Sequence, residues 1–342
     1  MAERTGVLLI NLGTPDSPTT RDVRRYLREF LSDPRVIDIP AVPRWLLVNL
    51  VIAPFRSPRS AAAYRKVWSA DGSPLLSNGL ALRDAVGAAL GDGYVVALGM
   101  RYGKPSIGSA LERLVAADVD RIVALPLFPQ WAESSTGSAV AKLEQETEAL
   151  AQAPPVEILP AFFDDPGWIE SLAEVAREPL AATRPDHVLF SYHGLPERQI
   201  QAADPSGAHC LASADCCDRP GAALPHCYRA QCYANTRAVS AALGLDPAQV
   251  STAFQSRLGR TPWIRPYTDL VLPELAAGGV KRLAVLCPSF VADCLETLEE
   301  IGIRAREQWR ELGGDVLTLV PCPNAHPRFV DAVAALIRRE AA

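Results

Sequence analysis

The sequence predicts an α/β fold with two doubly wound, Rossmann-like parallel-sheet halves that face each other across a cleft. Short apolar runs ending at glycine or proline alternate along the 342-residue chain with longer segments of helical periodicity. This alternation is typical of parallel sheets that are covered by helices on both faces. Segments of the first half of the chain also recur in the second half, which indicates a duplication.

The duplication is visible in two alignments that need no gaps. Residues 7–15 align with 188–196, and residues 104–122 align with 265–283 in the same order. Two matches in the same order predict two copies of one α/β unit.

The elements of the two copies follow from the apolar patterns. Strands are expected at residues 6–11, 95–100, 121–126, 156–160, 187–191, 249–253, 282–286 and 315–319. Helices are expected at 18–31, 58–67, 76–89, 107–116, 138–151, 168–177, 231–243, 268–276, 295–311 and 327–339. We expect the halves to be residues 1–162 and 163–342.

The composition narrows the class of protein. Hydrophobic residues make up 49% of the chain and charged residues 21%, which is typical of a globular protein with a large core. The net charge is −5 and no basic run is present, so no nucleic-acid partner is expected. The sequence shows no signal peptide and no apolar run of membrane-spanning length, which predicts a cytoplasmic protein.

Residues 42–55 form the first segment that interrupts the pattern, within a predicted lip at 42–58. The segment is apolar on nearly every side, unlike a surface helix. Two interpretations remain open. It is either a buried core helix or an exposed lip that touches a membrane or a large, flat, apolar ligand.

The second interruption, residues 208–232, contains five of the eight cysteines. It has no apolar periodicity, so it cannot bury enough surface to order itself. In a reducing compartment, a metal ion or an iron–sulfur cluster is the expected cross-link. The cysteine spacing lacks the paired C-x₂-C motifs of common zinc sites, which favours a group other than structural zinc.

Two places at the predicted sheet edges carry candidate chemistry. His193 follows the strand at 187–191, at the carboxyl edge where open α/β sheets bind ligands. Asp293, Glu296 and Glu300 lie three and four residues apart near a helix start. One interpretation of Asp293 and Glu296 is a capping box. The other is an acidic stripe that, with His193, forms a path for a divalent cation such as ferrous iron.

Several motifs together resemble the ferrochelatase family over nearly the whole chain. They are Leu-Gly-Thr-Pro at 12–15, Met-Arg-Tyr-Gly-Lys-Pro at 100–105, Pro-Leu-Phe-Pro-Gln-Trp at 126–131, Ser-Tyr-His-Gly at 191–194, Phe-Gln-Ser-Arg-Leu-Gly at 254–259, and Leu-Glu-Thr-Leu at 295–298. Each is weak alone, but they occur in the family's order.

The resemblance implies a chelatase-like fold and a lyase that inserts Fe²⁺ into protoporphyrin IX, the last step of heme biosynthesis, with release of two protons. His193 and Glu296 match the family's active-site pair, and which of them takes protons and which handles iron stays open. Asp293 and Glu300 match acidic residues behind the glutamate, on the expected path of the iron.

The resemblance also implies the porphyrin contacts and a location. The matching positions are Arg101, Tyr102, Gln130, Trp131, Ser135, Gln255 and Trp263. The lip at 42–58 matches the family's apolar lip, which favours peripheral contact of a cytoplasmic protein with the inner membrane. We expect a monomer or a homodimer. Trp131 and Cys294 depart from the pattern, because many relatives carry Tyr and His there.

The cysteine-rich segment resembles the internal cluster segment of some bacterial members. A [2Fe–2S] cluster takes four thiolates. The expected ligands are therefore four of the five cysteines Cys210, Cys216, Cys217, Cys227 and Cys232.

Three alternatives remain from the sequence. The first is a coproporphyrin III ferrochelatase, because Arg44, Arg56 and Arg59 flank the lip and would suit extra propionates. The second is an iron–sulfur electron-transfer or metal-binding protein on a chelatase fold, which leaves His193 and Glu296 without a role. The third is a two-lobed ligand carrier of the periplasmic type, which the absence of a signal peptide disfavours.

Overall fold

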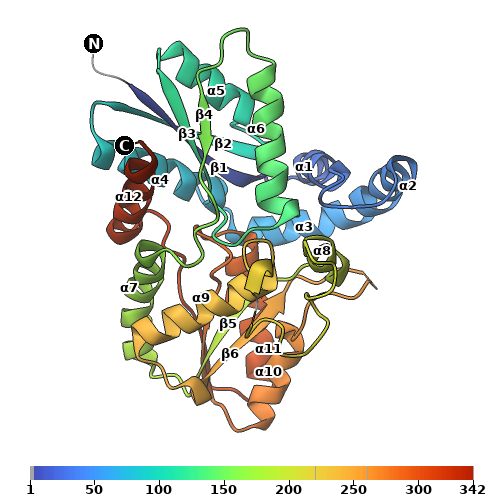
Figure 1. Ribbon diagram of the computed structural model, residues 1–342. Coiled ribbons are helices and arrows are strands. Elements are labelled where there is room, and N and C mark those ends of the chain that lie inside the picture. Colours follow the sequence, from blue (N-terminus) through green and yellow to red (C-terminus); the bar gives the residue numbers. More distant parts are fainter. Residues whose placement is uncertain (1–3, 220, 260, 342) are drawn as a thin grey trace. The chain divides into compact units, whose positions relative to one another are not determined.

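The structure, a computed structural model, has two compact units (Figure 1). It describes residues 4–219, 221–259 and 261–341. Unit 1 comprises the chain up to Phe128, residues Glu133–Ala161 and the C-terminal segment from Phe329 on. Unit 2 comprises Pro129–Ala132 and Phe162–Arg328.

The sheet of unit 1 is four-stranded and parallel, in the order β2-β1-β3-β4. Its strands are β1 (Thr5–Thr14), β2 (Tyr94–Gly103), β3 (Arg121–Pro126) and β4 (Val156–Ile158). The side chains of Val7, Leu8, Leu9 and Ile10 in β1 are all fully buried. A central strand that is apolar on both faces requires helices on both sides of the sheet.

The helices of unit 1 include those that form these two layers. They are α1 (Thr20–Ser32), α2 (Ala41–Leu46), the π-helical η1 (Leu47–Ile52), α3 (Ala53–Val67), α4 (Pro74–Leu90), α5 (Ile107–Ala116), the π-helical η2 (Glu133–Gly137), α6 (Ser138–Glu148) and most of α12 (Pro327–Ala341). Gly79 of α4 lies against Leu98, whereas Ile107 of α5 lies against Gly99. Neighbouring strand residues point to opposite faces, so α4 and α5 cover different faces.

Unit 2 repeats the arrangement, with a four-stranded parallel sheet in the order β6-β5-β7-β8. Its strands are β5 (His187–His193), β6 (Val250–Gln255), β7 (Arg282–Leu286) and β8 (Val316–Leu319). Its helices are α7 (Pro166–Thr183), α8 (Glu197–Ala202), the short η3 (Gly221–Ala223), α9 (Tyr228–Leu243), the short η4 (Pro247–Gln249), α10 (Thr268–Ala277), the π-helical η5 (Glu296–Ala305) and α11 (Arg306–Glu311).

The two faces of the unit 2 sheet have different cores. On one face, Leu189 of β5 packs in a cluster with Leu272 of α10 and Trp309 of α11. On the other face, the Tyr192 hydroxyl hydrogen-bonds to Asn235 and Thr236 of α9. Leu189, Ser191 and His193 alternate along one face of the strand. His193 therefore belongs to the α10 and η5 face.

The predicted fold class is confirmed, because the two units have equivalent parallel sheets surrounded by helices. All eight predicted strands are present. The aligned Lys104–Pro105 and Arg265–Pro266 peptide bonds are both cis. The amide N–H groups of Met100 and Phe254 donate to the carbonyl oxygens of Pro105 and Pro266, at 2.6 and 2.8 Å.

Some helices differ from the prediction. The helix expected at 295–311 is π-helical over Glu296–Ala305 and becomes α-helical only from Arg306. The helix expected from residue 58 begins at Ala53, with Pro58 inside it. Proline is common at the first position of a helix, so the sequence predicts a helix start at Pro58, five residues after the actual one. The helix α8 was not predicted.

The lip is exposed, which makes the buried-core interpretation of residues 42–55 wrong. Val42, Trp45 and Phe55 are 70%, 58% and 75% exposed, and Leu46, Leu50 and Val51 are also exposed. Only Val48 and Ala53 of this segment are fully buried. The lip therefore presents an apolar outer surface.

Candidate functional site

The carboxyl edge of the unit 2 sheet carries the candidate catalytic residues. His193 is the last residue of β5 and pairs in register with Gln255, the last residue of β6. Its partly buried ring is flanked by Trp263 and Phe290, with ring centroids 6.4 and 6.3 Å away. Aromatic neighbours on two sides restrict water around the imidazole.

The hydrogen bond of the His193 ring fixes its tautomer. Nδ1 lies 2.7 Å from the carbonyl oxygen of Gly194. A carbonyl oxygen only accepts, so Nδ1 carries the proton. In the neutral ring Nε2 is then unprotonated and can accept a proton or ligate a metal ion. A histidine that only served to bond the Gly194 carbonyl would explain the position of Nδ1. It would give Nε2 no role.

Gln255 ties the edge of β5 to the start of η5, where Glu296 lies. The Ser191 hydroxyl donates to Gln255 Oε1 at 2.7 Å, and Gln255 Nε2 donates to the carbonyl oxygen of Glu296 at 3.0 Å. The structure thus brings His193, Gln255 and Glu296 together at one sheet edge. π-Helical turns such as η5 occur frequently at functional sites.

The two other predicted acidic residues have full sets of partners. Glu300 accepts from the Ser256 N–H and hydroxyl at 2.9 and 2.5 Å. Asp293 accepts from the Asn324 amide, the Thr297 hydroxyl and the Cys322 N–H.

The capping-box interpretation of Asp293 and Glu296 is not what the structure shows. Asp293 lies before the helix, and its carboxylate bonds to residues 322 and 324 in a neighbouring loop. The Cys294 N–H is instead capped by the Thr297 hydroxyl at 3.0 Å. The three acidic residues consequently do not line one regular α-helical face.

Cys294 lies beside the candidate glutamate. Burial raises the pKa of its thiol well above the ordinary value, and the neighbouring Glu296 carboxylate adds to this rise. Cys287 and Cys322 are also buried, and burial raises the pKa of both thiols. These thiols remain protonated near neutral pH and contribute no negative charge to the edge.

In unit 1, Arg101 and Tyr102 belong to a buried network centred on Asp33. Arg101 Nη2 lies 2.5 Å from Asp33 Oδ2, which also accepts from the hydroxyls of Tyr102 and Ser138 at 2.8 and 2.5 Å. The Arg101 side chain is 15% exposed, and Tyr102 is buried. Ser135 lies in η2, next to this network in sequence. No motif pointed to Asp33, so sequence analysis missed it.

Gln130 and Trp131 belong to unit 2 and contact its loops. Gln130 Nε2 donates to the carbonyl oxygen of Pro288 at 3.1 Å, and the Trp131 N–H donates to Gln231 Oε1 at 2.7 Å. The Trp131 ring meets His226 edge-on, with centroids 5.8 Å apart. Gln231 is fully buried and was also missed by sequence analysis.

The cysteine-rich segment brings four of its five thiols together. Cys210 and Cys217 both interact with Cys227, and the Sγ atoms of Cys216 and Cys217 lie 3.9 Å apart. Burial raises the pKa of Cys210 and Cys216, whereas the Cys227 thiol and then burial raise that of Cys217.

Two further residues define the surroundings of these thiols. Arg229 donates from Nη1 to Cys217 Sγ at 3.1 Å. Cys232 lies inside α9 and is fully buried. Across residues 4–219, 221–259 and 261–341, no three His, Cys, Asp or Glu side chains are arranged to hold a metal ion.

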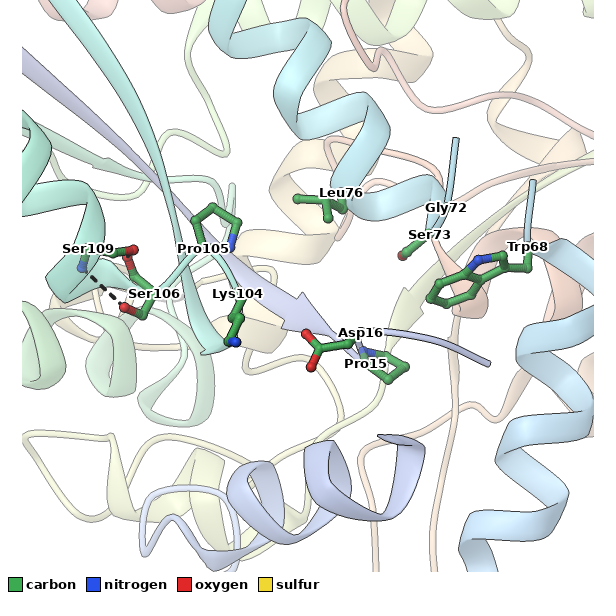
Figure 2. Close-up of a pocket in the computed structure, with 10 residues that line it drawn as sticks. All are labelled: Pro15, Asp16, Trp68, Gly72, Ser73, Leu76, Lys104, Pro105, Ser106 and Ser109. Carbon is green, nitrogen blue, oxygen red and sulfur yellow. Dashed lines mark hydrogen bonds between the residues drawn. The ribbon is translucent and has the colours of Figure 1, made fainter. Parts of the chain in front are cut away.

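A separate cavity of about 530 Å³ lies in unit 1 (Figure 2). It is lined by the ends of β1 and β2 and the starts of α4 and α5, with Asp16, Trp68, Lys104 and Ser106 among its side chains. None of the predicted site residues lines it. In the described part of the chain, no helix is long and apolar enough to cross a membrane.

Comparisons with known proteins give one consistent family. The sequence model described as ferrochelatase matches residues 4–341. The ferrochelatase of Coxiella burnetii (strain Dugway 5J108-111) is 49% identical over 336 residues, covering 98% of this chain and 94% of that protein. The ferrochelatase of Legionella pneumophila (strain Lens) is 47% identical over 340 residues, covering 98% and 99%.

Solved structures show the same fold at low sequence identity. SirB from Bacillus subtilis with Fe³⁺ covers 99% of this chain and 96% of its own, with a TM-score of 0.53 and 13% identity. The sirohydrochlorin chelatase SirB from Bacillus subtilis subspecies spizizenii, in complex with cobalt, gives 0.55 at 10% identity, covering 99% and 95%. The fold is therefore that of the chelatases.

Proposed function

The chain belongs to the ferrochelatase family, and we propose that it is the lyase that inserts Fe²⁺ into protoporphyrin IX to give protoheme. The reaction exchanges two pyrrole protons for one ferrous ion, so the site must bind iron and accept protons. Iron is the substrate here.

The observation that carries this proposal is the tautomer of His193. With Nδ1 donating to the Gly194 carbonyl at 2.7 Å, the neutral ring presents Nε2 as a base at the sheet edge. We assign His193 Nε2 the removal of a pyrrole proton.

Glu296 is the second proposed catalytic residue. Its backbone is anchored by Gln255, and its neighbour Cys294 carries a protonated thiol. Carboxylate and imidazole ligands suit ferrous iron. We assign Glu296 the binding of the incoming ion, and Asp293 and Glu300 the supply of negative charge behind it.

The remaining predicted contacts are proposed to hold the porphyrin. Arg101 supplies a guanidinium suited to a propionate, and Trp131 and Trp263 supply flat apolar surfaces. The Tyr102 hydroxyl is bonded to Asp33, so Tyr102 is proposed to act through Arg101, whose guanidinium lies 4.3 Å from the centre of its ring. Gln130, Ser135 and Gln255 complete the proposed set. Arg44, Arg56 and Arg59 are the residues that extra propionates of coproporphyrin would use.

The activity is tested by anaerobic turnover of the purified protein with Fe²⁺ and either protoporphyrin IX or coproporphyrin III. The expected result is a heme absorption spectrum, with a higher kcat/KM for protoporphyrin. A higher kcat/KM for coproporphyrin III would make that porphyrin the preferred substrate. If neither porphyrin gave heme, the proposed activity would be wrong.

For the cysteine-rich segment we propose a [2Fe–2S] cluster. The donor chemistry suits such a cluster, because four thiols lie near one another and Arg229 offsets the charge their thiolates would gain. No three of the described ligands surround one ion, but a [2Fe–2S] cluster takes only two thiolates on each of its irons. Cys210, Cys216, Cys217 and Cys227 would hold it, which leaves Cys232 as the spare cysteine. When bound, such a cluster cross-links a segment that has little core of its own.

The cluster proposal is tested by iron content and visible absorption of the anaerobically purified protein. We expect about two iron atoms per chain and a reddish-brown spectrum. Cys227→Ser should remove both signals, whereas the matched variant Cys232→Ser should keep them. A colourless wild-type protein would contradict the cluster, and colour lost only with Cys232 would change the ligand set.

For the lip we propose peripheral contact of a cytoplasmic protein with the membrane surface. The exposed apolar residues Trp45 and Phe55 can enter the headgroup region, and nearby Arg44 and Arg59 can meet anionic lipids. Trp45→Ser with Phe55→Ser should abolish co-sedimentation with phosphatidylglycerol vesicles. Leu270→Ser, at a residue exposed elsewhere, should not. Unchanged sedimentation of the double variant would contradict the proposal.

A further inference from the structure

Both backbone polar groups of His193 are bonded to side chains in a closed ring. The His193 N–H donates to Ser289 Oγ at 3.1 Å, and the Tyr228 hydroxyl donates to the His193 carbonyl oxygen at 2.8 Å. The hydroxyls of Tyr228 and Ser289 lie 2.7 Å apart. Because the Tyr228 proton goes to the carbonyl, the Ser289 hydroxyl must be the donor between them. The three hydrogen bonds therefore run in one direction around the ring, from the Ser289 hydroxyl to Tyr228 and from the Tyr228 hydroxyl to the His193 carbonyl, while the His193 N–H donates back to Ser289.

The ring replaces strand pairing on one side of β5. The register between β5 and β7 ends at Phe190 and Leu286, whereas the pairing with β6 continues to His193 and Gln255. On the β7 side the chain turns away at Pro288, which has no N–H to offer. Among the described residues, Tyr228 and Ser289 are the partners of the His193 backbone on that side.

Tyr228 also connects this edge to the cysteine-rich segment. It is the first residue of α9 and directly follows Cys227, the N-cap residue of that helix. The Cys227 N–H bonds to the Ala223 carbonyl, and Gln231 bonds to the carbonyls of Leu224 and Pro225. The position of the Tyr228 hydroxyl therefore depends on how the segment is packed.

We infer that Tyr228 is a positioning residue of the reaction, which through the ring with Ser289 holds His193 in place and couples it to the packing of the cysteine-rich segment. This inference rests on the proposed role of His193. Tyr228 acts through His193 and needs no contact with the porphyrin. Its loss should reduce the fraction of molecules in which Nε2 points at the substrate.

The first test is Tyr228→Phe, which keeps the aromatic ring and removes one hydroxyl. It should lower kcat about tenfold with the KM for porphyrin unchanged, because one hydrogen bond of the ring is lost and its partners stay buried. Ser289→Ala should give the same loss, and the double variant should be no worse, since both interrupt one ring. Ser289→Thr, which retains a hydroxyl, should restore activity. The matched control is Tyr233→Phe on the same helix, which should keep the wild-type kcat.

The second test reads His193 directly, by nitrogen-15 resonances of the five histidines assigned with a His193 variant. Wild type should show a single Nδ1–H tautomer for His193. Tyr228→Phe, Ser289→Ala and Cys227→Ser should each show a tautomer mixture. Wild-type kcat and an unchanged His193 signal in Tyr228→Phe and Ser289→Ala would overturn the ring's role. An unchanged signal in Cys227→Ser would overturn the coupling to the segment.

The two proposals fail in different ways. If His193→Ala retained full turnover, the catalytic role of His193 would fail while the spectroscopic test of the ring remained decisive. If Tyr228→Phe proved unstable, a normal kcat and His193 signal in the stable Ser289→Ala variant would still overturn the inference.

Discussion

Ser256 holds both carboxylate oxygens of Glu300, with its N–H at 2.9 Å from one and its hydroxyl at 2.5 Å from the other. Ser256 has a φ of 67°, a left-handed conformation that is uncommon for a residue with a side chain. A strained residue that fixes an acidic side chain is typical of a functional site. The relationship supports a role for Glu300 in the path of the iron.

Ser256→Ala should therefore affect iron more than porphyrin. Loss of the hydroxyl leaves Glu300 Oε2 with only the Arg304 guanidinium, 3.8 Å away. We expect the KM for Fe²⁺ to rise about fivefold with the KM for protoporphyrin unchanged. Steady-state kinetics with each substrate varied separately measures this. Ser251→Ala is the matched control, because Ser251 lies in β6, the strand that leads into Ser256, and bonds to His187 instead. Equal changes in both KM values would contradict the role of Glu300.

Asp33→Asn should destabilise unit 1 in a pH-dependent way. Burial raises the pKa of Asp33, but hydrogen bonds from Ser138, the Arg35 N–H and Tyr102, with the charge of Arg101, outweigh burial and leave it lowered. A lowered folded-state pKa stabilises the fold above the unfolded value of about 3.9, and this stabilisation is lost as pH falls through the folded value.

The measurement for Asp33 is urea unfolding of both proteins across pH. The variant should lose about 1–3 kcal/mol of the free energy of unfolding at pH 7. The difference from wild type should shrink below about pH 4, because the Asp33 carboxylate of the unfolded chain takes up a proton there before that of the folded chain does. A difference that stays constant with pH would show that charge on Asp33 is not the cause.

Gly13→Ala should be among the most damaging single changes in the chain. Gly13 has a φ of 121°, and a Cβ atom there would overlap the carbonyl oxygen of Tyr102 in the neighbouring strand. We expect a loss of more than about 4 kcal/mol in the free energy of unfolding, since both backbone strain and strand separation result.

Gly91→Ala is the matched control for Gly13. Gly91 also has a positive φ, of 90°, but nothing lies within 4 Å of its missing Cβ. Only the strain of about 1–2 kcal/mol should appear in thermal or urea unfolding. Similar losses in the two variants would mean that the close approach of β1 and β2 at Gly13 is relieved at little cost.

The sheets and the candidate edge were predictable because each strand has a local sequence pattern of apolar residues followed by glycine or proline. The apolar strand 187–191 followed by Gly194 predicts a strand end at His193, and the repeated segments predict the matching strand order of the two units. The exposure of Trp45 was not predictable in this way, because an all-apolar segment satisfies both a buried and an exposed interpretation.

What the sequence could not provide are contacts between distant residues. Asp33 lies 68 positions from Arg101, and Tyr228 lies 35 positions from His193. No local pattern encodes either pair. The π-helix at Glu296 was also missed, since its composition fits an α-helix and only the packing of residues 293–297 distinguishes the two.

The most direct test of the account is anaerobic protoheme formation by His193→Ala beside His187→Ala. His187 begins the same strand and bonds to Ser251 through Nε2, so its loss perturbs β5 without touching the proposed base. With both variants folded, the account predicts normal turnover for His187→Ala and a loss of at least about a hundredfold in kcat for His193→Ala. Comparable turnover by the two variants would contradict it.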